Sequence, residues 1–285
     1  MLQYLEQNKD ITNFSGYRTK AIARYFFELK SIEDIIKIKE IQDFAKGQGL
    51  KIEYIGGGMN IFFDFDVFEG IIIKNNLKGF EIKDKILDVN SGESVTFLVS
   101  KLERDFGNLN LKPWCSLPGT VGGAIIGNAG CFGLEVKDIF ISADIYDLSE
   151  NRIFEAGADF MKFEYRNTFL KKNKRYFIIS SKLDISKTID NFYSDDFRFK
   201  NQPKGFNCGS VFKNPEGLFA GKLIEDLGLK GKKIGGAEIS PVHANFIVSD
   251  GTATHNDIKE LLEFVKGAVF NEYGVNLEPE INIIF

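Results

Sequence analysis

The sequence predicts an α+β protein in which amphipathic helices and short strands are mixed within small lobes. Apolar residues recur at helical spacing after Ser31, a serine suited to cap a helix with Asp34 three positions on. Short apolar runs bounded by glycine or charged turns predict strands between the helices. Because the chain has 285 residues, two or three small domains are expected rather than one.

The first third predicts one helix and three short strands. Gly47 and Gly49 end the helix, and its apolar residues are Ile32, Ile35, Ile36, Ile41, Phe44 and Ala45. The strands are expected at residues 51–55, 61–63 and 70–73, with a glycine-rich turn at 56–60.

The middle third predicts a hairpin, a helix and three longer strands. The helix, at residues 94–106, has an inward face made of Val95, Leu98, Val99, Leu102 and Phe106. The hairpin is expected at residues 80–90, and the strands at 139–148, 152–155 and 175–185. A polar stretch at 186–203 is typical of a connection between domains.

The last third predicts two helices with a strand at residues 244–249 between them. The first helix ends at Gly228, and the second is capped by Thr254 and ends at Gly274. Their inward residues are Ala220, Leu223, Ile224 and Leu227 in the first, and Ile258, Leu261, Leu262, Val265 and Val269 in the second. His255, near the helix start, is expected to face solvent, and His243 to have a structural role.

Composition excludes several classes of function. A net charge of −4, with scattered lysines, provides no basic surface for nucleic acid. No apolar run approaches the length of a membrane span, and Met1 to Asp10 lacks the features of a signal peptide. Cys115, Cys131 and Cys208 form no C-x-x-C pair, which favours reduced thiols over a disulfide or metal site. A cytoplasmic monomer without a metal is expected.

Two glycine-rich loops indicate a dinucleotide ligand. The segment from Pro118 to Gly130 has five glycines in thirteen residues and almost no charge, and a second loop spans Gly56 to Asn60. Glycine removes the Cβ that would hold a ligand away, so several backbone N–H groups can approach one anionic group. Two such loops in one chain therefore predict that it binds a dinucleotide, with its phosphates at the loops.

The common nucleotide-binding fingerprints are absent. A G-x-G-x-x-G motif that begins at Gly56 needs glycine at position 61, where the chain has Ile61. A Walker loop fails at residues 217–222, because the segment is one residue short and Leu223 replaces the required Ser or Thr. Lys222 is therefore expected in an ordinary helix.

The motifs together resemble the UDP-N-acetylenolpyruvoylglucosamine reductase family, the flavoenzymes of early peptidoglycan synthesis. The matching segments occur in the family's order and span most of the chain: Gly56 to Asn60, Pro118 to Gly130, Tyr165-Arg166, Gly209 to Pro215, Ala220 to Ile224, His243 to Phe246 and Leu277 to Glu280. A glycine loop alone would suggest only the wider group of flavoproteins.

The resemblance implies a two-lobed FAD-binding module of the vanillyl-alcohol-oxidase/cresol-hydroxylase type, followed by a smaller α+β substrate-binding domain. The implied boundaries are residues 1–75 for the first lobe, joined by the C-terminal strand 281–285, then 76–187 and 188–280. NADPH is the implied hydride donor. FAD is implied to bind at Gly56, Gly57, Gly58, Met59, Asn60, Pro118, Gly119, Thr120, Gly122, Gly123, Asn128, Ala129 and Gly130.

The resemblance also implies roles in catalysis. Arg166 matches the residue that balances negative charge on the substrate carboxylate, Ser210 the proton donor, and Glu280 a group that stabilises the intermediate or helps deliver protons. Tyr165, Lys213 and Asn214 are implied substrate contacts. Without the resemblance, each residue has an ordinary structural explanation: a surface ion pair, a turn serine or an edge-strand acid.

The sequence departs from the family pattern at three places. Met59 occupies a position where serine is common, and Lys20-Ala21 replaces a frequent Gly-Gly. The short interval from Arg166 to Ser210 resembles the family's shorter form, which lacks the loop whose tyrosine covers the substrate. An FAD oxidase acting on another small molecule and a noncatalytic sugar-nucleotide sensor remain alternatives, although the full catalytic set argues against both.

Overall fold

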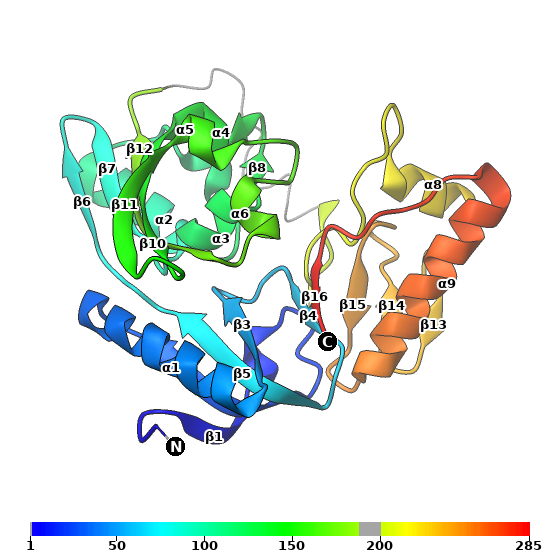
Figure 1. The fold of residues 1–285 in the computed structure, drawn as a ribbon. Coiled ribbons are helices and arrows are strands. Elements are labelled where there is room, and N and C mark those ends of the chain that lie inside the picture. Colours follow the sequence, from blue (N-terminus) through cyan, green and yellow to red (C-terminus); the bar gives the residue numbers. More distant parts are fainter. Residues whose placement is uncertain (1, 188–200) are drawn as a thin grey trace. The chain divides into compact units, whose positions relative to one another are not determined.

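The computed structural model describes residues 2–187 and 201–285, and the chain divides into two compact units (Figure 1). Unit 1 comprises Met1–Leu5, Phe26–Gly57 and Ile72–Asp195, and unit 2 comprises Glu6–Tyr25, Gly58–Ile71 and Asp196–Phe285. Most of the predicted connection at 186–203 lies outside the described residues. The three-part division of the chain stays a prediction.

A four-stranded sheet of order β1-β2-β5-β3 contains two of the places where the chain passes from one unit to the other. Its strands are β1 (Glu6–Asp10), β2 (Ile22–Leu29), β5 (Val67–Asn75) and β3 (Lys51–Ile55). The unit boundary passes through β2 and β5, so each unit is assembled from segments that are distant in sequence.

Helix α1 (Ile35–Gln48) follows a 3-10 turn, η2 (Ile32–Asp34), and the predicted cap residue Ser31 precedes this turn. Ser31 and Asp34 form the reciprocal capping box, and Gly49 ends the helix in the left-handed conformation. Two of the apolar residues that indicated this helix, Ile32 and Ile36, are 51% and 68% exposed. The buried residues are Ile35, Ile38, Ile41 and Ala45, a stripe that the helical turn separates from Ile36.

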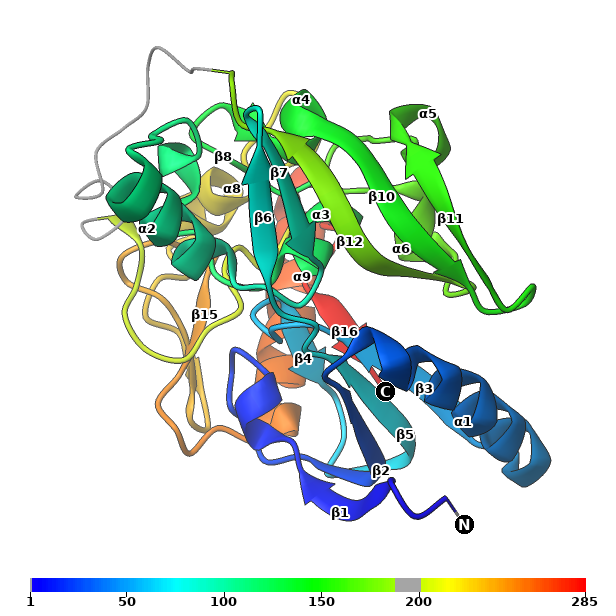
Figure 2. The same ribbon diagram turned by 90° about the vertical axis from the view of Figure 1, so that its left-hand side faces the viewer.

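A five-stranded antiparallel sheet of order β11-β10-β12-β7-β6 forms the centre of unit 1 (Figure 2). Its strands are β6 (Phe80–Lys83), β7 (Ile86–Asn90), β10 (Phe140–Asp147), β11 (Arg152–Gly157) and β12 (Tyr176–Asp184). The predicted hairpin is confirmed, with Asp84 and Lys85 at positive φ in the turn between β6 and β7.

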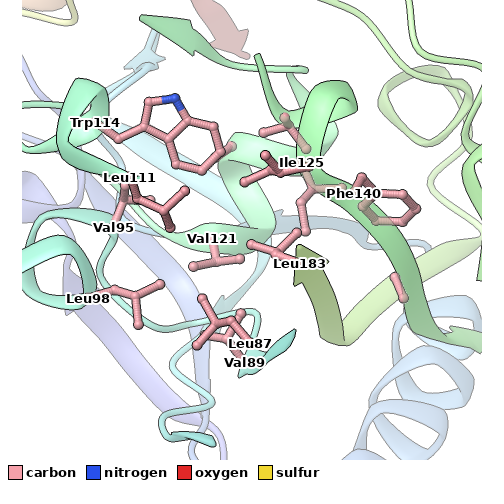
Figure 3. Packing of buried hydrophobic residues seen from close by; sticks show 14 of the residues in the cluster. Leu87, Val89, Val95, Leu98, Leu111, Trp114, Val121, Ile125, Phe140 and Leu183 are labelled. Carbon is pink, nitrogen blue, oxygen red and sulfur yellow. The ribbon is translucent and has the colours of Figure 1, made fainter. Parts of the chain in front are cut away.

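Helices α2 (Val95–Phe106) and α3 (Val121–Ile126) supply much of the apolar core of unit 1 (Figure 3). Leu98, Val121 and Ile125 pack in one cluster with Leu87 and Leu183 of the sheet. Phe106, predicted to face inward, is 57% exposed because the last turn of α2 carries it away from the stripe of Val95, Leu98, Val99 and Leu102.

Short elements complete unit 1, and several of them surround the second glycine-rich loop. They are η3 (Lys112–Trp114), β8 (Gly130–Cys131), β9 (Leu134–Glu135), α4 (Val136–Ile139), α5 (Ala158–Met161) and α6 (Phe169–Lys172). The buried Trp114 indole donates to the Leu134 carbonyl at 3.0 Å, which ties η3 to the β8–β9 hairpin.

Unit 2 is built around helix α9 (His255–Tyr273), which lies along a three-stranded antiparallel sheet (Figure 1). Thr254 caps α9 in a capping box with Asp257, as the sequence predicts for the cap, and Gly274 ends it. The other elements are η1 (Thr12–Phe14), β4 (Ile61–Phe63), α8 (Ala220–Asp226), β13 (Lys233–Ile234), β14 (Ala237–Ile239), β15 (Ile247–Ser249) and β16 (Asn282–Ile284).

Strand β16 pairs in parallel with β4, so the end of the chain is joined to residues near position 61. Lys222 lies on α8 and pairs with Asp226, in agreement with the prediction of an ordinary helix. In the described residues, no helix is both long and apolar enough to cross a membrane.

The prediction that His255 faces solvent was wrong. Its side chain is 14% exposed, and Nδ1 lies 3.2 Å from Oδ1 of the buried Asp64, which also pairs with Lys259 at 2.8 Å. Asp64 directly follows β4, and its backbone N–H donates to the Ile284 carbonyl at 2.8 Å. The strand pairing therefore helps to place a carboxylate beside the start of α9, where negative charge is favourable.

Candidate functional site

The two glycine-rich loops meet within unit 1. A Cβ on Gly56 would lie 2.5 Å from Thr120 Oγ1, and a Cβ on Gly57 would lie 3.0 Å from the Gly119 Cα. The distance at Gly56 is shorter than real Cβ contacts, and the distance at Gly57 is at their lower limit, so the packing of the loops requires glycine at position 56 and favours it at position 57. The sequence predicted two loops for one ligand, and the structure places them in contact.

Most N–H groups of the second loop are used inside the protein. The Gly122 N–H donates to the Ser91 carbonyl at 2.7 Å, and the Gly123 N–H to Thr120 Oγ1 at 3.4 Å as the cap of α3. In residues 2–187 and 201–285, no hydrogen bond is assigned to the N–H groups of Gly57, Gly119 and Thr120. These N–H groups could bind a diphosphate, which fits FAD.

The predicted cofactor residue Asn128 has protein partners for its side chain. Its amide nitrogen donates to Glu135 Oε2 at 3.1 Å and to the Glu164 carbonyl at 2.9 Å, and its oxygen accepts from the Lys137 N–H at 3.1 Å. This fully buried carboxamide therefore links the end of the glycine-rich loop to the hairpin that follows and to the segment before Arg166.

The remainder of the first loop, Gly58 to Asn60, belongs to unit 2. The Asn60 side chain donates to the Glu280 carbonyl at 3.1 Å, and the Asn60 carbonyl accepts from the Asn282 N–H at 2.9 Å. Asn60, predicted to bind the cofactor, thus also holds the backbone of a predicted catalytic residue. Met59 is partly exposed.

Tyr165 and Arg166 lie at the tip of a tight turn in unit 1. Glu164 and Asn167 close the turn through two backbone hydrogen bonds of 3.0 and 3.3 Å. Arg166 has a φ of 53°, which is uncommon for a residue with a side chain. Its guanidinium lies 5.3 Å from the centre of the Tyr165 ring, and Nη2 donates to the Gly130 carbonyl at 3.3 Å.

Glu135, which belongs to no motif of the sequence, lies at the same place. A Cβ on Gly130 would lie 2.8 Å from Glu135 Cγ and 3.1 Å from Arg166 Nη1, so both side chains approach the bare Cα of Gly130. Burial opposes ionisation of Glu135, but Lys137, Asn128 and Arg166 outweigh it and hold the pKa of this carboxyl below its ordinary value. The carboxylate therefore stays charged beside Arg166.

A surface hollow of about 480 Å³ surrounds this group in unit 1. Arg166 and Glu135 line it together with the β8–β9 hairpin residues Gly130, Cys131, Phe132, Gly133 and Leu134 and the following Lys137 and Asp138. A cationic guanidinium at the wall of an open hollow is suited to bind a carboxylate through two parallel hydrogen bonds.

Ser210 and Glu280 lie on neighbouring segments of unit 2. The Glu280 N–H donates to the Val211 carbonyl at 2.8 Å, and Phe212 and Pro279 form an antiparallel bridge. Ser210 is half-buried and follows Gly209, whose φ of 79° is left-handed. The structure therefore brings together two predicted catalytic residues that are 70 positions apart in the numbering of the chain.

The predicted substrate residues Lys213 and Asn214 follow on the same segment. Lys213 Nζ donates to Glu278 Oε1 at 2.5 Å, and Asn214 Oδ1 accepts from the Ala220 N–H at 3.1 Å. Asn214 thus uses its oxygen at the start of α8, and its amide nitrogen is the atom suited to donate to a substrate.

Two family models match the chain. One, described as an FAD binding domain, matches residues 23–157 and includes both glycine-rich loops. The other, described as the C-terminal domain of UDP-N-acetylenolpyruvoylglucosamine reductase, matches residues 202–284 and includes Ser210 and Glu280. Fold and loops together define an FAD-dependent oxidoreductase.

Relatives that match nearly the whole length of the chain identify the family more closely. The reductase of Caldicellulosiruptor saccharolyticus is 33% identical over 98% of this chain and 91% of its own length, and that of Prochlorococcus marinus strain NATL2A is 34% identical over 97% of each. The crystal structure of the Thermus caldophilus reductase has the same fold, with a TM-score of 0.79 at 24% identity over 98% of both chains. The chain belongs to the UDP-N-acetylenolpyruvoylglucosamine reductase family, which supplies peptidoglycan precursors.

Proposed function

We propose that the protein reduces UDP-N-acetylglucosamine enolpyruvate to UDP-N-acetylmuramate with NADPH as the hydride donor. Bound FAD would transfer the hydride from NADPH to the terminal carbon of the enolpyruvyl group. The observation that supports the proposal most is the pairing of the Ser210 and Glu280 segments in unit 2. Ser210 matches the family's proton donor, and Glu280 matches the group that stabilises the intermediate or helps to deliver the proton.

Arg166 has the task of balancing charge. When hydride is added to the terminal carbon, negative charge grows on the substrate carboxylate, and a fixed guanidinium stabilises this more negative intermediate more strongly than it binds the carboxylate of the unreacted substrate. The tight turn and the contacts with Gly130 and Glu135 hold Arg166 in one orientation before substrate binds.

Ser210 donates the proton to the adjacent carbon. A serine hydroxyl is a weak acid, but an enediolate is basic enough to take its proton, and a donor held in place needs no diffusion step. Glu280 is proposed to stabilise this intermediate or to help return a proton to Ser210. Lys213 and the Asn214 amide nitrogen are proposed to bind the diphosphate or the uracil of the substrate, and Tyr165 a further part of it.

The test is an anaerobic stopped-flow measurement of the two half-reactions on the FAD-loaded protein and its Ser210→Ala variant. Because the donor acts only after hydride has left the flavin, flavin reduction by NADPH should stay nearly unchanged. Flavin reoxidation by UDP-N-acetylglucosamine enolpyruvate should slow by roughly 10²–10⁴-fold.

The matched control is Ser100→Ala, which removes an exposed serine hydroxyl on α2 in unit 1. It should leave both half-reactions at the original rates. Equal slowing of both half-reactions in Ser210→Ala would contradict its role as the proton donor. A wild-type flavin that NADPH reduces but the enolpyruvyl compound does not reoxidise would contradict the proposed substrate.

A further inference from the structure

We propose that Asn245 and His243 are positioning residues for proton delivery by Ser210. They hold the backbone that follows Ser210, and thereby decide where its hydroxyl stands relative to the carbon that receives the proton. This inference rests on the proposed function of Ser210 and adds two residues that act through it.

Asn245 binds the two residues that follow Ser210 with three hydrogen bonds. Its side-chain nitrogen donates to the Phe212 carbonyl at 2.8 Å, and its side-chain oxygen accepts from the Phe212 N–H at 2.9 Å. Its backbone carbonyl accepts from the Val211 N–H at 2.8 Å. Since Asn245 is only 4% exposed, water cannot readily replace these hydrogen bonds. The carboxamide bonds both backbone groups of Phe212, as a residue of a paired strand would.

The other side of the same segment is bonded to the segment of Glu280. The Val211 carbonyl accepts from the Glu280 N–H at 2.8 Å, and the Lys213 N–H donates to the Glu278 carbonyl at 2.9 Å. Residues 211–213 are therefore hydrogen-bonded both to Asn245 and to residues 278–280. A shift of this segment would move Ser210 relative to Glu280.

His243 in turn fixes Asn245. Its Nδ1 accepts from the Asn245 N–H at 3.1 Å, and its ring packs edge-on against Phe246 with centroids 4.9 Å apart. Burial, helped by the nearby Lys230, lowers the pKa of His243, so the ring is neutral with Nδ1 as the acceptor and the proton on Nε2. His243 thus accepts a hydrogen bond from Asn245 and does not transfer a proton in the reaction.

The position of the donor has a stereochemical consequence. The carbon that Ser210 protonates becomes a stereocentre, and a donor fixed on one face produces one configuration. If the Ser210 hydroxyl is displaced, water can deliver the proton from either face. The configuration of the lactyl group therefore reports donor position, whereas a general loss of stability would lower the amount of active enzyme without changing the configuration of the product.

The first test is Asn245→Asp in the FAD-loaded protein, because a carboxylate has nearly the same shape but cannot donate to the Phe212 carbonyl. Flavin reduction by NADPH should be unchanged, and reoxidation by the enolpyruvyl substrate should slow by about 10²-fold, the usual effect of a small misplacement. NMR of the product should show the second lactyl epimer. Asn271→Asp, at an exposed position on α9, is the matched control and should behave as wild type.

The second test compares two substitutions of His243. His243→Asn keeps an acceptor near the position of Nδ1 and should retain fast reoxidation and a single epimer. His243→Leu removes the acceptor and should resemble Asn245→Asp. Equal behaviour of the two His243 variants would overturn the assignment of His243.

Measuring Ser210→Ala in the same experiment distinguishes failure of the positioning proposal from failure of the proton-donor assignment. If Ser210→Ala slows reoxidation while Asn245→Asp reoxidises at the wild-type rate and yields one epimer, the positioning proposal is overturned and the donor assignment survives. If Ser210→Ala reoxidises normally, the proposed function of Ser210 is wrong. If Asn245→Asp slows both half-reactions equally with a single epimer, Asn245 has only a structural role.

Discussion

Gly130 shows why one residue of a glycine-rich loop can be needed for more than ligand binding. Its φ is not left-handed, so the backbone conformation alone does not require glycine. What requires it is the close approach of Glu135 Cγ and Arg166 Nη1, at 2.8 and 3.1 Å from the position a Cβ would take. The glycine, predicted as a cofactor contact, also provides the space in which the guanidinium is held.

Gly130→Ala should therefore displace Arg166. We expect KM for the enolpyruvyl substrate to rise about tenfold, which corresponds to roughly 1.4 kcal/mol of lost binding, with the FAD content of the purified protein unchanged. Gly127→Ala is the matched control, because its Cβ would meet only the Gly123 carbonyl at an ordinary 3.5 Å. Loss of FAD together with an unchanged KM would show that Gly130 serves the cofactor alone.

At the scale of elements, the turn from β10 to β11 is held by an ion pair in which the Asp147 carboxylate is buried and Arg175 is partly exposed. Arg175 donates to both oxygens of Asp147, at 2.7 and 2.6 Å, and the N–H groups of Ser149 and Glu150 also bond to Asp147 Oδ1. The hydrogen bonds from Arg175 outweigh burial and lower the pKa of Asp147 to about 2. The pair joins the end of β10 to the start of β12.

This pair should make stability depend on pH at the acidic end. Since the pKa of Asp147 is lowered on folding from an ordinary 3.8, its contribution is fully present above about pH 4 and is lost as the pH falls toward about 2. Asp147→Asn should cost about 1–3 kcal/mol in urea unfolding at neutral pH, and the deficit should shrink as the pH approaches 3. Asp159→Asn, at an exposed position, serves as control. A deficit independent of pH would contradict this account.

At the scale of the whole molecule, we expect cofactor retention to depend on two loops that are about sixty residues apart in sequence. They pack through Gly56 and Thr120 in unit 1, and the family model for FAD binding spans both. A ligand that binds only the folded protein stabilises it, by about 2.7 kcal/mol at one hundred times its Kd. Separation of the loops should therefore reduce both FAD affinity and the stabilisation that FAD provides.

Gly56→Ala should separate them, because its Cβ would lie 2.5 Å from Thr120 Oγ1. We expect Kd for FAD, measured by flavin fluorescence, to rise about tenfold or more. Adding Thr120→Ala removes the clash, so the double variant should bind FAD better than the sum of the single effects predicts. Gly47→Ala has open space around its Cβ and should leave FAD binding unchanged. Strictly additive effects at residues 56 and 120 would argue against loop packing as the cause.

Local pattern was sufficient for much of the secondary structure and for the candidate residues. The capping box at Ser31, the hairpin after Phe80 and the cap at Thr254 each involve residues within a few positions of one another, and all occur where the sequence predicts them. The family assignment was also accessible, because glycine loops and the segments around Ser210 and Glu280 are recognisable as short motifs. The roles of the individual site residues remain predictions.

Tertiary structure alone decided which of these residues meet. The approach of Arg166 to Gly130 and Glu135, and the contact of Asn245 with Phe212, join segments more than thirty residues apart, and no local periodicity encodes such pairs. His255 is largely shielded from solvent for the same reason, since Asp64, which follows a strand nearly two hundred positions away, contacts it. The local elements, the loops and the family were predictable from the sequence, because they depend on neighbours along the chain. The fold decided the partners of each side chain, because burial and hydrogen bonding are settled between distant segments.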